Sequence, residues 1–122
     1  MVHLGFEDVK NVIQFMKNHT GFPMIFSHAA FPFYQQLWKS ITMREDTFVD
    51  VSSHHVNGTV LRRAYWALGA ERLLFGTDDP YGEPDYGLKM QKWIMSLNLT
   101  SSEESLILRD NFIKITSWIS DE

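Results

Sequence analysis

Three short runs of strand-forming residues, separated by stretches with helical periodicity, limit the folds open to this chain. The runs are Met24–Phe26, Thr47–Val51 and Leu73–Phe75, and they start 23 and 26 residues apart. Intervals of this size leave room for one helix between consecutive strands, as right-handed parallel units require. The sequence therefore predicts an α/β fold in which parallel strands alternate with helices.

Helical periodicity fills the intervals between these runs. It predicts helices over Glu7–His19, Phe33–Ile41, Gly58–Leu68 and Tyr86–Leu97. The third helix has Asn57 at its start and Gly69 at its stop, and a capping-box pattern at Thr100–Glu103 opens a last helical stretch. The side chains expected in the core of the last two helical stretches are Leu88, Trp93, Ile94, Leu97, Ile107, Phe112, Ile115 and Trp118.

Composition excludes several classes of partner and site. Lys and Arg number 11 against 15 Asp and Glu, and this net charge of -4 argues against a nucleic-acid surface. Cysteine is absent, so His, Asp or Glu would have to hold any metal. No apolar stretch approaches the roughly 20 residues that cross a bilayer, and Met1–Gly5 shows no secretory leader. We therefore expect a cytoplasmic protein with a small-molecule partner.

Polar side chains follow each of the three runs, where a parallel sheet gathers functional groups. His28 follows the first run, His54 and His55 follow the second, and Asp78 follows the third. Imidazole and carboxylate are both zinc ligands, although either group alone also fits a hydrogen-bonded or turn role. In an extended segment the adjacent His54 and His55 would point in opposite directions, which allows at most one of them in a site and favours an exposed loop pair.

The motifs Ser27–Pro32, Phe48–Ser52 and Arg72–Pro80 resemble, in this order, those of the amidohydrolase-related TIM-barrel hydrolases. Lead-in and closing segments, Leu68–Arg72 and Leu99–Phe112, are also similar to the family, so the resemblance covers nearly the whole chain. It implies an eight-stranded (β/α) barrel that binds one or two divalent metals, zinc or alternatively manganese. Such barrels hydrolyse or decarboxylate small substrates.

The resemblance also implies roles for individual residues. Asp78 takes the position of the last-strand aspartate, which contacts the metal and activates the attacking water. His28 takes that of a metal-binding or substrate-binding histidine, and His3 could take that of a metal ligand on the preceding strand. Asp79 lies where the family varies and receives no role.

One family feature is missing from these 122 residues. The first strand of such barrels ends in a His-x-His pair, and this sequence contains none. A complete barrel takes roughly 250 residues. The chain therefore resembles the C-terminal half of a barrel, a single partial domain over residues 1–122 with about strands five or six to eight. Unpaired edges of such a half predict self-association or pairing with a missing N-terminal half.

Two alternatives remain from the sequence. A non-catalytic receiver-like module would bring Asp50, Asp78 and Asp79 together around magnesium, and a degenerate half-barrel would bind no metal. The hydrolase hypothesis instead requires His28 and Asp78 to lie on one rim of the sheet.

Overall fold

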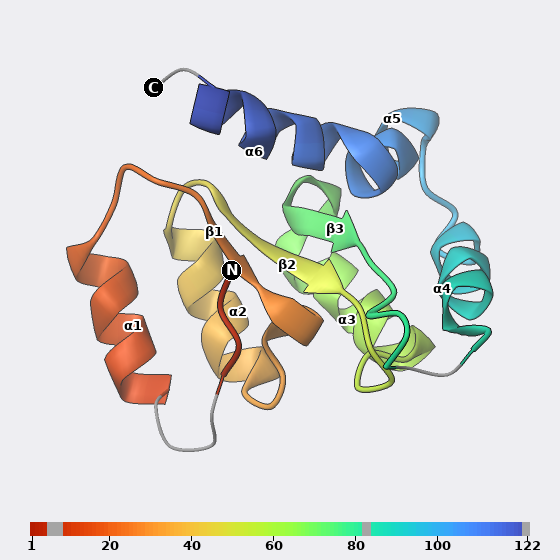
Figure 1. The fold of residues 1–122 in the computed structure, drawn as a ribbon, viewed down its shortest axis with the longest axis horizontal. Coiled ribbons are helices and arrows are strands. Elements are labelled where there is room, and N and C mark those ends of the chain that lie inside the picture. Colours follow the sequence, from red (N-terminus) through yellow and green to blue (C-terminus); the bar gives the residue numbers. More distant parts are fainter. Residues whose placement is uncertain (5–8, 82–83, 121–122) are drawn as a thin grey trace.

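The computed structural model describes residues 1–4, 9–81 and 84–120, with side chains as far as residue 117. The elements in chain order are α1 (Val9–Asn18), β1 (Met24–Phe26), α2 (Tyr34–Met43), β2 (Thr47–Val51), α3 (Gly58–Leu68), β3 (Leu73–Phe75), α4 (Tyr86–Met95), α5 (Ser101–Ser105) and α6 (Asn111–Ser120). Short segments η1 (Ser27–Ala30) and η2 (Ala70–Arg72) are 3-10 helical, and η3 (Leu106–Asp110) is π-helical. Strands and helices alternate as predicted (Figure 1).

The three strands form one parallel sheet in the order β1-β2-β3. Val49 pairs with Phe26 on one side and with Leu73 on the other, so β2 is central. Val2 adds a single parallel bridge to Phe26 on the outer side of β1. All carboxyl ends therefore lie at one edge of the sheet, which confirms the predicted α/β architecture.

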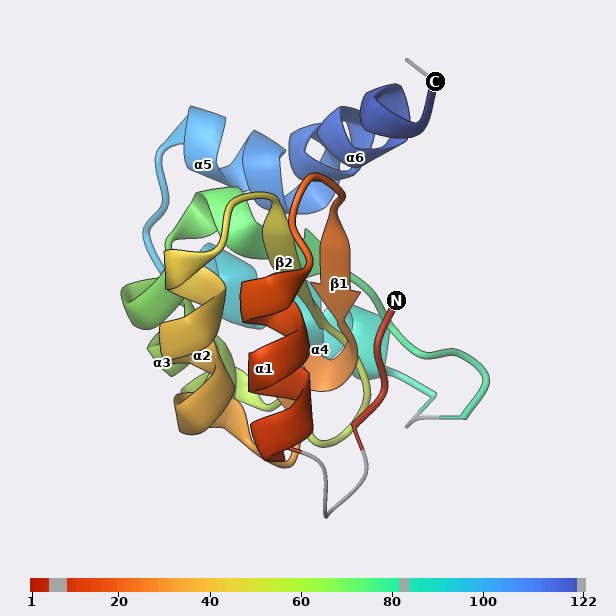
Figure 2. The same cartoon turned by 90° about the vertical axis from the view of Figure 1, so that its left-hand side faces the viewer.

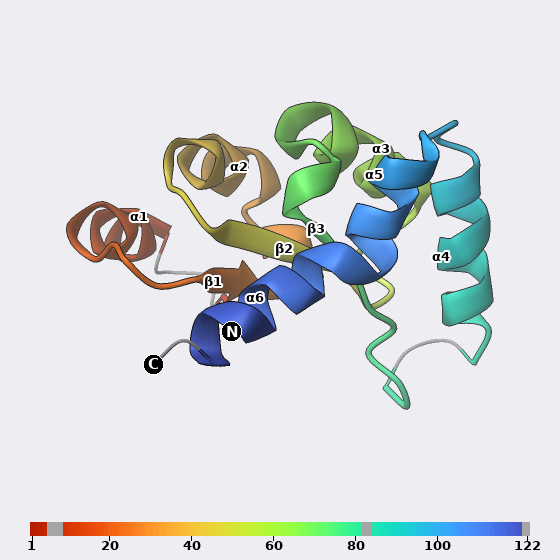
Figure 3. The same ribbon diagram turned by 90° about the horizontal axis from the view of Figure 1, so that it is seen from above.

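Helices cover the two faces of the sheet unequally. Figure 3 shows α1, α2 and α3 side by side along one face, while α6 crosses the other. The larger core lies beneath the three helices and includes Phe26, Val49, Leu37 and Leu61, all fully buried. On the opposite face Phe48 and Leu74 pack against Ile115 of α6. In Figures 1 and 2, α6 lies beyond the amino ends of the strands, which leaves their carboxyl ends to the loops.

Local signals in the sequence account for several element ends. The Asn57 side chain accepts the Val60 N–H, and Gly69 stops α3 at a φ of +78° that glycine adopts without strain. Thr100 and Glu103 form the reciprocal capping box at the start of α5. These three sequence predictions are confirmed.

Other helix predictions need correction. The helix expected over Phe33–Ile41 is shifted, and α4 ends at Met95, just before Asn98 adopts a positive φ of 55°. The first helix starts at Val9 in the described part of the chain, and the predicted start at Glu7 lies outside the described residues, as does the side chain of Trp118.

Two predicted core residues are exposed. Leu88 is 64% exposed and Phe112 is 60% exposed. Periodicity identifies an apolar stripe on a helix but not the side from which a neighbour packs against it. In α4 the buried side chains are Tyr86, Met90 and the predicted Ile94. Phe112 lines a shallow groove of about 370 Å³ beside the free edge of β3.

In the part of the chain that the structure describes, no helix has the length and apolar character needed to cross a bilayer. The cytoplasmic location stays a prediction.

Candidate active-site rim

His28 follows β1 in an unusual backbone conformation. It has a φ of +57°, and Ala29 and Ala30 follow at +55° and +71°. Left-handed conformations cost non-glycine residues roughly 1–2 kcal/mol each, and strain of this kind clusters at functional sites. The His28 N–H donates to Asp50 Oδ1 at 3.0 Å, and its ring Nδ1 lies 3.0 Å from Ser52 Oγ. Contacts from β2 and its loop therefore fix both the backbone and the ring of His28.

His3 lies beside His28. The N–H of Val2 donates to the Ile25 carbonyl at 2.7 Å, and the Ser27 N–H donates to the Val2 carbonyl at 3.0 Å. Because Val2 is paired in this way with the end of β1, the residue that follows it, His3, lies at the carboxyl end of that strand. The His3 and His28 rings meet edge to face with 5.2 Å between their centroids. The structure thus brings two of the predicted ligands together.

Two tyrosines hold the loop that follows β2. Tyr34 Oη donates to the carbonyl of His55 at 2.5 Å, and Tyr86 Oη donates to the carbonyl of Val56 at 2.8 Å. Burial raises the pKa of Tyr34 to about 12 and also raises the pKa of Tyr86. Both hydroxyls therefore stay protonated donors at neutral pH, and the loop is anchored to α2 and α4.

The predicted opposite orientation of His54 and His55 is wrong. Both lie in a turn, with their ring centroids 4.1 Å apart, because the chain leaves the extended conformation at Ser53 (φ +67°). His55 is half-buried, stacks on Phe31 at 3.9 Å and lies 6.3 Å from the His28 ring. Burial lowers the pKa of His55, and the His54 and His28 rings lower it further. His55 therefore presents a neutral imidazole beside the predicted ligand.

Asp78 occupies a tight turn after β3. Its φ is +65°, and its carbonyl accepts the Tyr81 N–H at 2.9 Å. The negative charge of Asp78 acts to raise the pKa of His55, against the larger effect of burial, and it also raises the pKa of Tyr86. His28 follows β1 and Asp78 follows β3, so both lie beyond the carboxyl ends of parallel strands of one sheet.

Asp79 has the features of a turn residue. Its side chain is exposed, and its N–H donates to Thr77 Oγ1 at 3.3 Å. Among the described residues, no hydrogen bond or ring contact joins Asp79 to the histidines of the rim.

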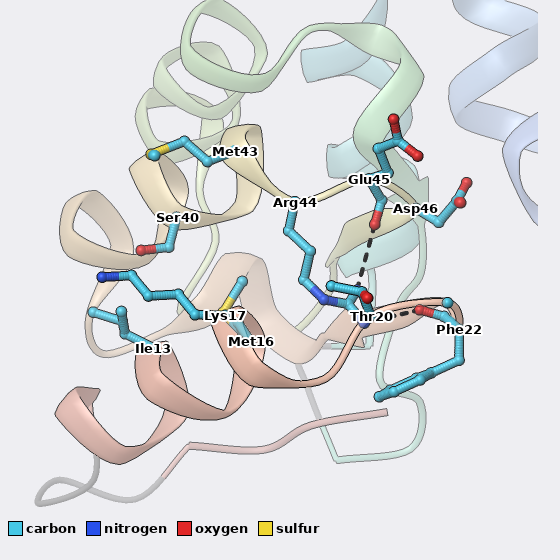
Figure 4. Close-up of a pocket in the computed structure, with 11 residues that line it drawn as sticks. Ile13, Met16, Lys17, Thr20, Phe22, Ser40, Met43, Arg44, Glu45 and Asp46 are labelled. Atoms are coloured by element: carbon cyan, nitrogen blue, oxygen red, sulfur yellow. Dashed lines mark hydrogen bonds between the residues drawn. The ribbon is translucent and has the colours of Figure 1, made fainter.

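A cavity of about 500 Å³ lies at the opposite end of the sheet, between α1 and α2 (Figure 4). Arg44 is one of its charged lining residues, and this guanidinium already donates to the carbonyls of His19 and Phe22 and to Thr47 Oγ1. No predicted site residue lines this cavity. The rim at the carboxyl ends is therefore the better candidate for chemistry.

The sequence model of the amidohydrolase family matches residues 2–115, which include all three strands, His3, His28 and Asp78. The chain belongs to this family. A search of curated proteins finds no significant match.

Three solved structures are similar to this amidohydrolase chain, and each of them is a longer protein. An amidohydrolase from Burkholderia multivorans with bound zinc is similar at 16% identity with a TM-score of 0.73, over 90% of this chain and 49% of its own. For a protein assigned as a 2-pyrone-4,6-dicarboxylic acid hydrolase from Pseudomonas putida, the identity is 20%, the TM-score 0.66 and the coverages 95% and 50%. A 2,6-dihydroxybenzoate decarboxylase from Rhizobium matches at 18% identity, a TM-score of 0.56 and coverages of 82% and 35%. At such identities the likeness shows a shared fold.

The chain spans about half the length of the first two of these structures. It therefore corresponds to part of an amidohydrolase barrel, as the sequence predicted.

The donor groups of this amidohydrolase chain fit part of a metal centre. His3, His28 and Asp78 supply ligand types that zinc prefers. Among residues 1–4, 9–81 and 84–120, however, no three His, Cys, Asp or Glu side chains lie together in a way that could hold a metal. The three predicted ligands do not form a complete site, and neither do the acidic residues of the receiver-like alternative. Their role as ligands stays a prediction.

Sequence reasoning did not predict that Ser52 and Asp50 contact His28. A signal was present, because residues two apart in a strand point to the same face, and this pair stands where β2 meets its loop. Their importance depends on the pairing of β1 with β2, which brings His28 within reach of both and which the sequence does not specify.

Proposed function

We propose that this chain supplies part of the active site of a metal-dependent hydrolase that acts on a small molecule. The observation that carries the proposal is the edge-to-face imidazole pair of His3 and His28 at the carboxyl end of β1, in a parallel sheet whose strand β3 is followed by Asp78. In barrels of this class, catalytic groups stand at the carboxyl ends of the strands. Membership of the amidohydrolase family supports the reaction type.

Each residue has a proposed role at the rim. A bound divalent ion, zinc or alternatively manganese, supplies a Lewis acid that lowers the pKa of a coordinated water. His28 and His3 would hold the ion through ring nitrogens, and Asp78 would contact it and accept the proton of the attacking water. The zinc in the Burkholderia relative supports this choice of metal.

The substrate is proposed to be a small molecule. The structural relatives include a protein assigned as the hydrolase of a ring dicarboxylic acid and a decarboxylase of a ring acid. Loops from the whole rim determine specificity in such barrels. We therefore propose no particular bond for cleavage.

The free edges of the sheet are proposed to pair with the remaining strands of the barrel. In the described residues β3 pairs only with β2, and Val2 makes only the bridge to Phe26. The groove beside β3 is lined by the exposed apolar side chains of Leu108, Phe112 and Ile113. Self-association would satisfy the same edges, and the mass of the particle in solution distinguishes a second copy from another chain.

Metal binding by the 122-residue chain tests the proposal. Competition with a chromophoric chelator measures the affinity for zinc and for manganese. His28→Ala and Asp78→Ala are each expected to weaken binding at least about 100-fold, since loss even of groups outside the ligand set costs 10–100-fold. His19→Ala is the matched control, because His19 is exposed and stacks on Phe15 away from the rim.

Two outcomes would contradict the proposal. In one, neither ion binds even when the missing half of the barrel is restored, as the degenerate half-barrel predicts. In the other, His28→Ala and Asp78→Ala bind as tightly as His19→Ala.

A further inference from the structure

We propose that Ser52 and Asp50 are positioning residues that hold His28 in the tautomer with its proton on Nδ1 and its lone pair on Nε2. The geometry behind this inference is a chain of three groups: the His28 ring, the Ser52 hydroxyl and the Asp50 carboxylate. It deepens the proposed function and rests on it for the role of His28.

The number of available protons determines the tautomer. Ser52 Oγ carries one proton and makes a short hydrogen bond to Asp50 Oδ1. An ionised carboxylate can only accept, so the serine donates its proton to Asp50. Ser52 Oγ therefore faces His28 Nδ1 with a lone pair, at 3.0 Å. Nδ1 must donate, and in a neutral imidazole this leaves Nε2 as the acceptor.

Asp50 also holds the backbone of His28. Its Oδ1 accepts the His28 N–H at 3.0 Å, at the first of three consecutive residues with positive φ. The same carboxylate oxygen thus fixes the strained turn directly and the ring through Ser52. Ser52 is 6% exposed and Asp50 is 9% exposed, so bulk water does not compete strongly for either contact.

The arrangement prepares Nε2 for a ligand. A histidine that binds a metal commonly donates its other ring N–H to an oxygen acceptor, which fixes the ring orientation and the tautomer. Here the acceptor is the Ser52 hydroxyl, which donates its own proton to the Asp50 carboxylate. Among the hydrogen bonds of the described residues, Nε2 of His28 has no partner that would occupy its lone pair.

Nuclear magnetic resonance of the ¹⁵N-histidine-labelled 122-residue chain tests the tautomer without any metal. Spectra are recorded near pH 8, about 1.5 units above the ordinary histidine pKa of about 6.5, and the signals are assigned with single His→Gln variants. We expect the wild-type His28 ring to be protonated at Nδ1. In Ser52→Ala the ring loses its acceptor, and we expect a mixture of tautomers or protonation at Nε2.

Two further variants separate positioning from folding. Ser52→Thr keeps the hydroxyl and is expected to restore the wild-type tautomer. Ser53→Ala is the matched control, because Ser53 Oγ accepts the His55 N–H at 3.2 Å and does not contact His28. A wild-type His28 protonated at Nε2, or a tautomer that is the same in wild type and folded Ser52→Ala, would overturn the inference.

Zinc affinity gives a second measurement. We expect Ser52→Ala to lower it about 10- to 100-fold and Ser52→Thr to leave it within about threefold. If no zinc binds even with the missing half of the barrel restored, the proposed function fails while the tautomer is still decided by the spectra. If zinc binds and Ser52→Ala leaves both affinity and tautomer unchanged, the inference fails and the proposed function stands.

Discussion

At the amino end of the sheet, carbonyl oxygens surround the guanidinium groups of Arg44 and Arg72, whereas at the carboxyl end one buried hydroxyl, that of Ser27, lacks a hydrogen-bond partner among the described residues. Arg44 donates to the carbonyls of His19 and Phe22 and to Thr47 Oγ1, and Arg72 donates to three carbonyls between 2.8 and 3.1 Å. At the other end, the buried Ser27 hydroxyl has no hydrogen-bond partner among the described residues.

All three nitrogens of the buried Arg44 guanidinium donate hydrogen bonds within the protein, which indicates a structural role for this charge. Unpaired buried groups reduce stability, by about 1–3 kcal/mol each. Among the described residues the one such group is the Ser27 hydroxyl, which follows β1 at the rim of the sheet, and departures of this kind from full pairing are typical of functional sites.

Removal of Arg44 is expected to have the largest effect on stability. Arg44→Met leaves buried carbonyls without donors, so we expect the free energy of unfolding to fall by about 3 kcal/mol. Urea denaturation measures the change. Lys39→Met, at an exposed position of α2, is the control and should stay within about 0.5 kcal/mol of wild type. A loss for Arg44→Met as small as that of the control would show that the enclosed guanidinium does not stabilise the fold.

At the carboxyl end, Ser27→Ala is expected to act in the opposite direction. The substitution removes a buried hydroxyl that makes no hydrogen bond, so the free energy of unfolding should rise by about 1 kcal/mol. Ser52→Ala provides the contrast, since it removes two contacts and should destabilise. If Ser27→Ala lowers stability instead, the hydroxyl has a partner in solution and the two ends differ less than the structure indicates.

The smallest effect is expected for the half-buried pair of Tyr65 and Glu103. Tyr65 Oη donates to Glu103 Oε2 at 2.6 Å, and this bond lowers the pKa of the Glu103 carboxyl below its usual 4.5. The unfolded chain then binds more protons than the folded chain near that pH, so stability falls as the pH falls through this range. In Tyr65→Phe the fall should be shallower.

Unfolding measured from about pH 6 to about pH 3 tests this expectation. Tyr81→Phe is the control, because Tyr81 is 84% exposed and its ring makes no such bond in the structure. Identical pH profiles for Tyr65→Phe and wild type would show that the pair makes no measurable contribution.

The strands could be predicted from the sequence because their pattern depends on local composition. Thr47–Val51 and Leu73–Phe75 occur in the structure with the predicted bounds. Core positions in α4 and α6 were predicted less well. The burial of Leu88 or Phe112 depends on which neighbour approaches, and that information is not local.

The candidate site divides in the same way. The strand-end positions of His28 and Asp78 follow from the order of the elements along the chain. The approach of His55 depends on a turn at Ser53 with positive φ, a conformation that serine rarely adopts and that its sequence context does not signal. The contact between His28 and Ser52 depends on packing of one strand end against the next loop.

The two tyrosines that hold the loop after β2 have a consequence for protein engineering. Tyr34 and Tyr86 belong to different helices, yet both donate to carbonyls of residues 55 and 56. A graft of residues 52–56 into another barrel therefore moves only part of the unit that determines its shape. The recipient barrel must have hydroxyl groups at the positions of Tyr34 and Tyr86, because without them the orientation of the transplanted His54 and His55 is not maintained.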